Sequence, residues 1–134
     1  MGTEHEQADR ARQNESAAWT ERALEQMAAA NAEEAVAAFR AALRADPENF
    51  DAYHGLVRAL CDLGQTENAV ATALALTVLT PDDPLAHTSL SIALQQAGQI
   101  PQAEAAAGRA RILEWKRQLA TDSELEADAH AGIQ

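Results

Sequence analysis

Small and apolar residues recur along this chain with a period of 34 residues. Within each period, two runs of apolar residues at helical spacing are separated by a short turn, and a polar or proline-containing loop precedes the next period. A period of this length with two short helices in it predicts an array of helical hairpins. Two sets of equivalent positions show the period best: Trp19, Tyr53 and His87 in the first helices, and Ala30, Gly64 and Gly98 where those helices must end.

Caps and helix breakers divide the three periods into six expected helices. Asn49, Thr66 and Asp83 are expected N-caps, and Pro47 and Pro81 close the first two periods. The last helix meets no stop signal until about residue 119, so its extra turns are expected to pack back over the open end of the array. Those turns carry Ile112, Leu113, Trp115 and Leu119. The expected helices span 16–29, 33–45, 50–63, 67–79, 84–97 and 101–119.

The two ends of the chain differ in composition from the middle. Residues 1–15 are charged with hardly any apolar side chains, which predicts a flexible or helical N-terminal extension. Residues 16–120 form the predicted three-repeat domain. Residues 121–134 form an acidic C-terminal tail with four acids and no Lys or Arg. Thr121 and Glu124 stand at capping-box spacing, so this tail is either disordered or a short separate helix that ends near His130.

The central period resembles the tetratricopeptide repeat family. Its Tyr53, Leu56 and Leu60, followed by Gly64, Ala69 and Pro81, fit the family pattern, and the match extends over about 16–115. The resemblance implies an all-α fold, a right-handed superhelical solenoid of three helix-turn-helix hairpins with an extended C-terminal capping helix. Ala73 and Leu76 reverse the family's usual order of a large and then a small residue.

Charge and composition exclude several kinds of partner and compartment. The formal net charge is −11, which opposes binding to nucleic acid or to an anionic membrane. No apolar run approaches the roughly 20 residues that cross a bilayer, and the first residues lack the apolar core of a signal peptide. The single cysteine, Cys61, cannot form an internal disulfide. We therefore expect a cytoplasmic protein.

The residues that could carry chemistry do not form a recognisable catalytic or metal site. The four histidines are scattered, no glycine-rich phosphate loop occurs, and Cys61 has no cationic neighbour that would activate its thiol. We interpret His87 as a packing residue between helices and Cys61 as an inert thiol. The sequence thus predicts no enzymatic activity, no cofactor and no metal. The histidines are His5, His54, His87 and His130.

The family resemblance implies a binding groove. In such solenoids the first helices of the hairpins line a concave surface that accepts a peptide or helix of another protein. The positions that it implies here mix aliphatic contacts with polar groups, which suits a peptide with an acidic or amide group near an apolar side chain. Arg58 either reads an acidic ligand or balances Asp62 one turn on. The predicted groove residues are Thr20, Leu24, His54, Arg58, Asp62, Thr88, Ile92 and Gln96, with Met27, Ala28, Cys61 and Gln95 in the same rows.

One specialised groove is not expected. Members of the family that act as co-chaperones grip a terminal carboxylate with Lys, Asn and Arg, and none of these stands at the matching positions. The function that the sequence favours is a non-enzymatic interaction module: an adaptor, assembly factor or chaperone-like scaffold. The residues at the clamp positions are Thr20, Leu24, Gly55, Leu85 and Ser89.

The convex side offers a second candidate surface. Ala71, Leu74 and Val78 recur at three and four residues along one expected helix. If they are exposed, they form an apolar stripe that favours self-association or docking; otherwise a neighbouring helix or the tail covers them. The competing function is therefore a structural subunit of a larger homo- or hetero-oligomeric complex that docks through its convex face and ends.

Overall fold

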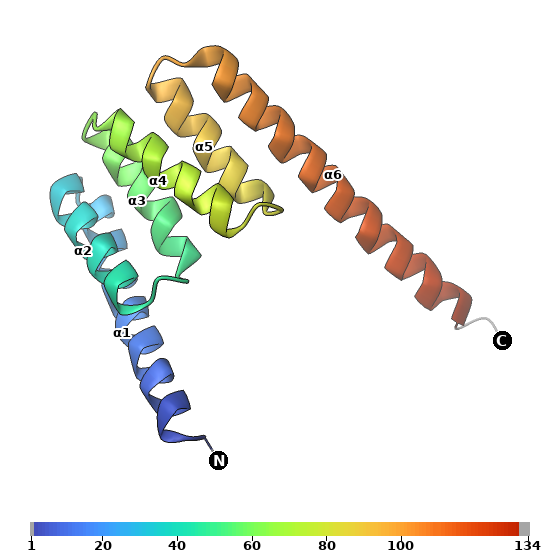
Figure 1. Cartoon of the computed structure of the whole chain (residues 1–134), viewed down its shortest axis with the longest axis horizontal. Coiled ribbons are helices and arrows are strands. Elements are labelled where there is room, and N and C mark those ends of the chain that lie inside the picture. Colours follow the sequence, from blue (N-terminus) through green and yellow to red (C-terminus); the bar gives the residue numbers. More distant parts are fainter. Residues whose placement is uncertain (1, 132–134) are drawn as a thin grey trace.

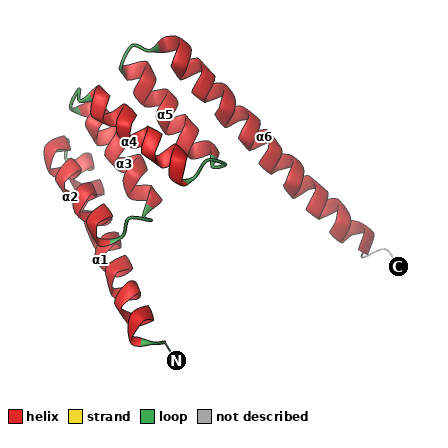
Figure 2. Ribbon diagram, in the orientation of Figure 1, coloured by secondary structure: helices red, strands yellow, loops and turns green. Residues whose placement is uncertain are grey.

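Six helices joined by short turns make up the computed structural model, which describes residues 2–131 (Figures 1 and 2). Consecutive helices pair as three hairpins, and no strand occurs in the described range. The prediction of an all-α array of helix-turn-helix hairpins is confirmed. The helices are α1 (Glu4–Ala28), α2 (Ala32–Ala45), α3 (Phe50–Asp62), α4 (Thr66–Leu79), α5 (Pro84–Gln96) and α6 (Ile100–Ala131).

The three hairpin turns share one backbone conformation. The second residue after each first helix has a positive φ, 61° at Ala30, 74° at Gly64 and 79° at Gly98. The next backbone N–H then bonds back into the helix that has just ended, as Gln65 N does to Leu60 O at 2.9 Å. This is the left-handed helix ending that glycine favours because it has no Cβ. The same turn is therefore made at an intrinsic cost in the first hairpin, where alanine replaces glycine.

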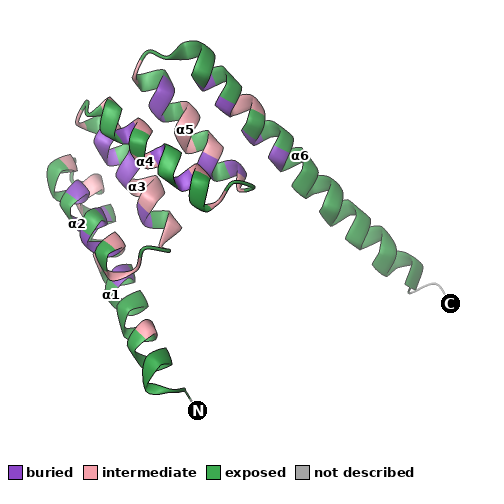
Figure 3. Cartoon of the chain, in the orientation of Figure 1, coloured by how far each residue is buried: buried purple, intermediate pink, exposed green. Residues whose placement is uncertain are grey.

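Close approach between helices depends on alanine. Each helix packs against the next along the chain, and α3 also contacts both α1 and α5. The buried residues lie in the body of the array, whereas the free ends of α1 and α6 are exposed (Figure 3). Only a few large side chains are fully buried, among them Phe39, Leu60, Leu76 and Val57. Most of the remaining core is alanine, which lets the helix backbones approach each other closely.

The first and second hairpins meet through a matched large and small residue. Phe39 of α2 is fully buried. A Cβ built on Gly55 in the middle of α3 would lie 2.2 Å from Cζ of this ring, far inside van der Waals contact. Glycine inside a helix costs about 1 kcal/mol relative to alanine. That cost is offset here because only glycine lets the Phe39 ring lie against the α3 backbone.

A polar cluster joins the first three helices. Asn49 caps α3 by accepting a hydrogen bond from Ala52 N at 3.1 Å. Its Nδ2 also donates to Ser16 Oγ at 2.8 Å and to Thr20 Oγ1 at 2.9 Å, both on α1. Ser16, which is almost fully buried, donates in turn to the carbonyl of Ala42 on α2 at 2.7 Å. The expected cap at Asn49 thus also connects neighbouring helices.

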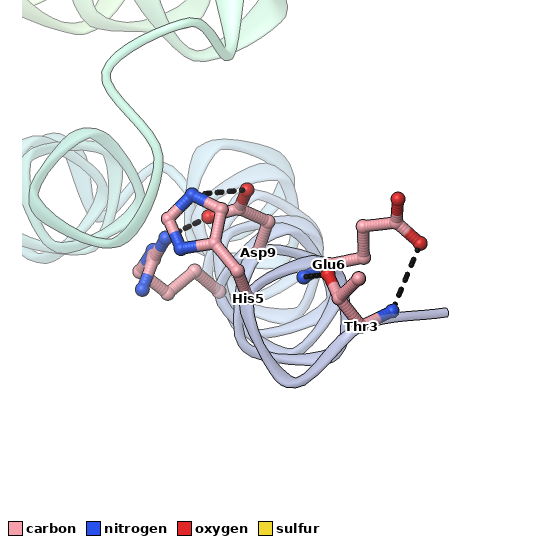
Figure 4. Close-up of polar contacts among 5 residues, drawn as sticks. Thr3, His5, Glu6 and Asp9 are labelled. Atoms are coloured by element: carbon pink, nitrogen blue, oxygen red, sulfur yellow. Dashed lines mark hydrogen bonds and ion pairs between the residues drawn. The ribbon is translucent and has the colours of Figure 1, made fainter. Parts of the chain in front are cut away.

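The N-terminal segment is one helix with the first repeat helix. We expected that helix to begin near Ser16, but α1 begins at Glu4. Thr3 Oγ1 accepts from Glu6 N at 3.2 Å, and the Glu6 carboxylate accepts from Thr3 N at 3.2 Å (Figure 4). This capping box satisfies two free N–H groups at the helix start. Asp9 adds an ion pair with Arg12 and lies 3.7 Å from His5.

The last helix corrects two expectations. It continues to Ala131, so Thr121 and Glu124 lie inside α6 and do not open a separate helix. Its extra turns also do not pack back: of the four residues expected to do so only Leu113 is buried, while Trp115 is 64% exposed. The reason is that no glycine or proline interrupts residues 109–131, and an uninterrupted helix cannot fold back on the body. Residues 132–134, the end of the predicted tail, lie outside the described residues.

Two smaller expectations concern the second hairpin. Thr66 is the first residue of α4 and Gln65 is its N-cap, without a side-chain bond, so the expected cap at Thr66 is wrong by one position. Ala73 and Leu76, the reversed large and small pair, are both fully buried. In α4 the large buried side chain is therefore Leu76, and the small one is Ala73.

Candidate functional site

The predicted groove positions lie on three helices that are neighbours in space. The α3 helix contacts α1 on one side and α5 on the other. Leu24 of α1 is 52% exposed and Ile92 of α5 is 43% exposed. Arg58 of α3 is also exposed. One row of the predicted groove is therefore exposed on all three helices, with two aliphatic members and one cationic member.

Arg58 forms no salt bridge with Asp62. Both side chains are exposed, and no salt bridge joins Arg58 to any residue within 2–131. The described residues thus provide no salt-bridge partner for Arg58 in its second possible role, the balancing of Asp62. Its guanidinium, with five N–H donors, is available to an acceptor from outside the chain.

Two predicted groove residues hold helices together. Thr20 is half-buried and belongs to the Asn49 cluster, and its hydroxyl also donates to Ser16 O at 3.0 Å. His54 of α3 is half-buried, with Nδ1 2.6 Å from Ser89 Oγ of α5. Because the Thr20 hydroxyl and His54 Nδ1 already have partners, these two side chains position the face and have less to offer a ligand.

The remaining predicted positions vary in exposure. Thr88, Gln95 and Gln96 are exposed on α5, and the Thr88 hydroxyl donates to Pro84 O at 3.0 Å. Met27 is half-buried and packs on the core, whereas Ala28 is exposed. Asp62 and Met27 border a surface depression of about 580 Å³ at the end of the first hairpin. Its other lining residues are Ala30, Asn31, Ala32, Glu33, Glu34 and Leu63.

The Cys61 thiol has low reactivity in the structure, whereas the polar contact of His87 is with the turn before its own helix and not with another helix. Burial raises the pKa of the Cys61 thiol, and the negative charge of Asp62 raises it further. The thiol is thus held in its neutral, weakly nucleophilic form at neutral pH. His87 is half-buried, and its Nε2 lies 2.8 Å from the carbonyl of Pro81. The ring therefore anchors the turn that leads into α5.

The predicted apolar stripe on α4 is open in this structure. Ala71 is exposed, Leu74 is 49% exposed and Val78 is 79% exposed. The helix has only one charged residue, Glu67 in its first turn. A helix without charges on its outer face is normally covered, and no described residue covers this one.

Sequence reasoning missed the residues that fit the helices together. The Phe39–Gly55 contact has one signal in the sequence, because a glycine in the middle of an expected helix often marks a site where another element approaches the helix backbone closely. The capping box at Thr3 and Glu6 had its full sequence signature and was not used. The second role of Asn49 had no local signal, since its partners are Ser16 and Thr20 on another helix.

Two properties of the described chain bear on the site. No three His, Cys, Asp or Glu side chains within 2–131 come together in a way that could hold a metal ion. No helix in the same range combines the length and the apolar composition needed to cross a membrane.

Comparison with known proteins supports the repeat interpretation. A family model described as tetratricopeptide repeat matches residues 26–91, and the predicted resemblance is confirmed over this segment. A search of curated proteins gave no match. Among solved structures, the chain is similar to the type III secretion translocator chaperone SycD of Yersinia enterocolitica, in a crystal form described as an alternative dimer.

The similarity to SycD extends over most of both molecules. The TM-score is 0.69 at 21% sequence identity, and the alignment covers 90% of this chain and 96% of the SycD chain. At this identity the comparison shows a shared fold. With the matching family model, it supports a protein-interaction scaffold.

Proposed function

We propose that this protein is a non-enzymatic interaction module that binds a peptide or helix of a partner protein on the face formed by α1, α3 and α5. The observation that carries this proposal is the exposure of Leu24, Arg58 and Ile92 on three adjacent helices. Repeat scaffolds bind extended segments on such continuous faces. The role is that of an adaptor, an assembly factor or a chaperone-like scaffold, and the similarity to a translocator chaperone favours the last.

The chemistry of the face indicates the class of ligand. Leu24 and Ile92 are positioned to contact apolar side chains, and burying each against a ligand would contribute about 1–2 kcal/mol. Arg58 has no carboxylate partner among residues 2–131 and can bind an acidic or amide group. The α5 helix carries no charged residue. A segment with an acidic or amide group next to an apolar side chain would therefore fit best.

Capture of partners from native cell extract tests the proposal. The wild type is compared with a Leu24→Ala, Arg58→Ala, Ile92→Ala triple variant, after circular dichroism shows that both are folded. These three side chains lie on the surface, so the helices should be retained. We expect a partner that the wild type captures and the triple variant loses, with binding weakened by at least tenfold.

A matched control separates this face from the rest of the surface. Arg40 and Arg44 are exposed on α2, away from the predicted groove, and changing both to alanine should leave capture unchanged. Equal capture by the wild type and the groove triple variant would contradict binding on this face. A single Arg58→Glu change sharpens the test, because it should repel an acidic peptide while leaving purely apolar contacts in place.

A second function is favoured by the uncovered stripe on α4. Leu74 and Val78 are exposed on a helix with one charged residue, which suits a structural subunit that docks through its convex face. Changing both residues to Glu should then release the neighbouring subunit. An unchanged mass in solution and unchanged partner binding by the folded double variant would rule this function out.

A further inference from the structure

The C-terminal half of α6 lies beyond the body of the protein. Leu113 is its last buried residue, and every described residue from Glu114 to Ala131 is exposed. One turn further along α6, Arg117 forms an ion pair of 3.7 Å with Asp83, the N-cap of α5. Beyond that point the helix projects alone (Figures 1 and 3). A helix of this length is marginal in water without tertiary contacts.

An apolar stripe lies on the outer face of this helix. Ile112, Trp115 and Leu119 are spaced by three and four residues and are 47%, 64% and 46% exposed. The residues that α6 packs on α5 follow the same spacing on the opposite face, as the helical period of 3.6 requires. They are Ala103, Ala106, Ala110 and Leu113. The outer stripe is therefore available to a partner without disturbing the hairpin.

Charge is divided between the two halves of the helix around this stripe. Residues 109–117 hold four of the ten basic residues of the chain and a single acid, Glu114. Residues 118–131 hold four acids and no Lys or Arg. The rest of the molecule is strongly acidic, so this is the one dense basic segment. The bases are Arg109, Arg111, Lys116 and Arg117, and the acids are Asp122, Glu124, Glu126 and Asp128.

We propose that α6 is a self-association surface on which a second copy of this chain binds in antiparallel orientation. The basic half of each helix then lies against the acidic half of the other. With the two-fold axis near Leu119, Lys116 of one copy lies level with Asp122 of the other, and Arg109 lies within one turn of Glu126. Trp115 and Leu119 of both copies are buried at the centre. Such a contact is isologous and closes at a dimer.

The charge pattern favours a second copy over other occupants of the stripe. A parallel pair would bring like charges together, which is unfavourable. The free part of α1 cannot cover the stripe, because residues 4–15 contain no apolar residue larger than alanine. The α4 stripe of another molecule would cover Trp115 but has no base to pair with the acids of α6. Of these occupants, only an antiparallel copy matches both the apolar and the charged residues. This inference does not depend on the face proposed for peptide binding.

Charge reversal on full-length protein tests the pairing, with mass measured by sedimentation equilibrium. One variant carries Arg109→Glu and Lys116→Glu, and the other carries Asp122→Lys and Glu126→Lys. We expect a dimer for the wild type and at least tenfold weaker dimerisation for each variant alone, since several ion pairs are replaced by repulsion. An equal mixture of the two variants should recover the dimer as a heterodimer.

Two controls make the result specific. Arg40→Glu with Arg44→Glu on α2 makes the same change in net charge as the first variant and should leave the dimer intact. In a Trp19→Phe background, the emission of Trp115 should shift to longer wavelength as the dimer is diluted. A wild type that stays monomeric at the highest soluble concentration would overturn the proposal. A dimer that both reversed variants retain would overturn it equally, as would one that only Leu74→Glu with Val78→Glu disrupts.

Discussion

The two junctions between repeats use equivalent positions in opposite ways. Where α2 meets α3, the Phe39 ring lies against the bare backbone at Gly55. One period later, the positions of Phe39 and Gly55 are taken by Ala73 and Ser89. Ser89 then lies 2.6 Å from Nδ1 of His54 on α3. At these equivalent positions the first junction is thus a fit of volumes, whereas the second has a polar contact between neighbouring first helices.

The helices and turns therefore recur from one repeat to the next, whereas the side chains that join neighbouring repeats can differ. A fully buried ring against a backbone tolerates no added atom, since protein interiors are close-packed. A half-buried imidazole and hydroxyl pair can exchange its bonds with water at a small net cost. We therefore expect the first junction to dominate stability and the second, which lies under the proposed binding face, to tolerate change.

The largest effect should follow from adding one methyl group at the first junction. Gly55→Ala places a Cβ 2.2 Å from the Phe39 ring and should lower the free energy of unfolding by about 2 kcal/mol. This loss should appear even though alanine favours a helix over glycine by about 1 kcal/mol. Urea unfolding followed by circular dichroism measures it.

Gly108→Ala in α6 is the matched control for that substitution. Its nearest neighbouring atom would be 3.7 Å away, an ordinary contact, so the same change should stabilise the protein by about 0.5–1 kcal/mol. Adding Phe39→Leu to Gly55→Ala should make the two changes strongly non-additive. If Gly55→Ala proves as harmless as Gly108→Ala, the volume fit at the first junction is wrong.

A second prediction compares the caps at the two junctions. Asn49 and Asp83 are one period apart and each caps the following helix, but only Asn49 also bonds to α1. Asn49→Ala should cost about 1–2 kcal/mol, because it removes the cap and the interhelical bond to the buried Ser16 hydroxyl. Asp83→Ala should cost about 1 kcal/mol or less. Thermal unfolding of both variants checks the order, and a larger loss at Asp83 would contradict it.

The smallest predicted effect concerns the hairpin turns. Ala30 has a φ of 61° where the other two hairpins have glycine. Ala30→Gly should therefore stabilise the protein by about 0.5–1 kcal/mol by removing steric strain. The reverse change, Gly64→Ala, should destabilise by a similar amount, and nothing lies within 4 Å of the added Cβ to complicate it. Changes of the same sign in both variants would show that strain at φ does not decide the outcome.

Prediction from sequence succeeded where the signal was local. Two of the three hairpin turns follow from Gly64 and Gly98, since glycine readily adopts a positive φ. Pro84 after Asp83 marks the start of α5. The 34-residue period placed all six helices, with inner ends correct within a residue or two. The period did not predict where α1 begins and α6 ends, because no neighbouring repeat limits the helix at either place. The binding face stays a prediction, although the structure shows that Leu24, Arg58 and Ile92 are exposed.

The repeat, its turns and the helices between them follow from the sequence alone, because each depends on interactions among residues a few positions apart. Which side chains meet across helices depends on the packing of the whole array. Phe39 and Gly55 are joined by the packing of α2 on α3, and His54 finds Ser89 because α3 and α5 are neighbours. Whether Trp115 is covered or exposed depends on what else lies over its face of α6. That is a property of the whole arrangement, and no local pattern encodes it.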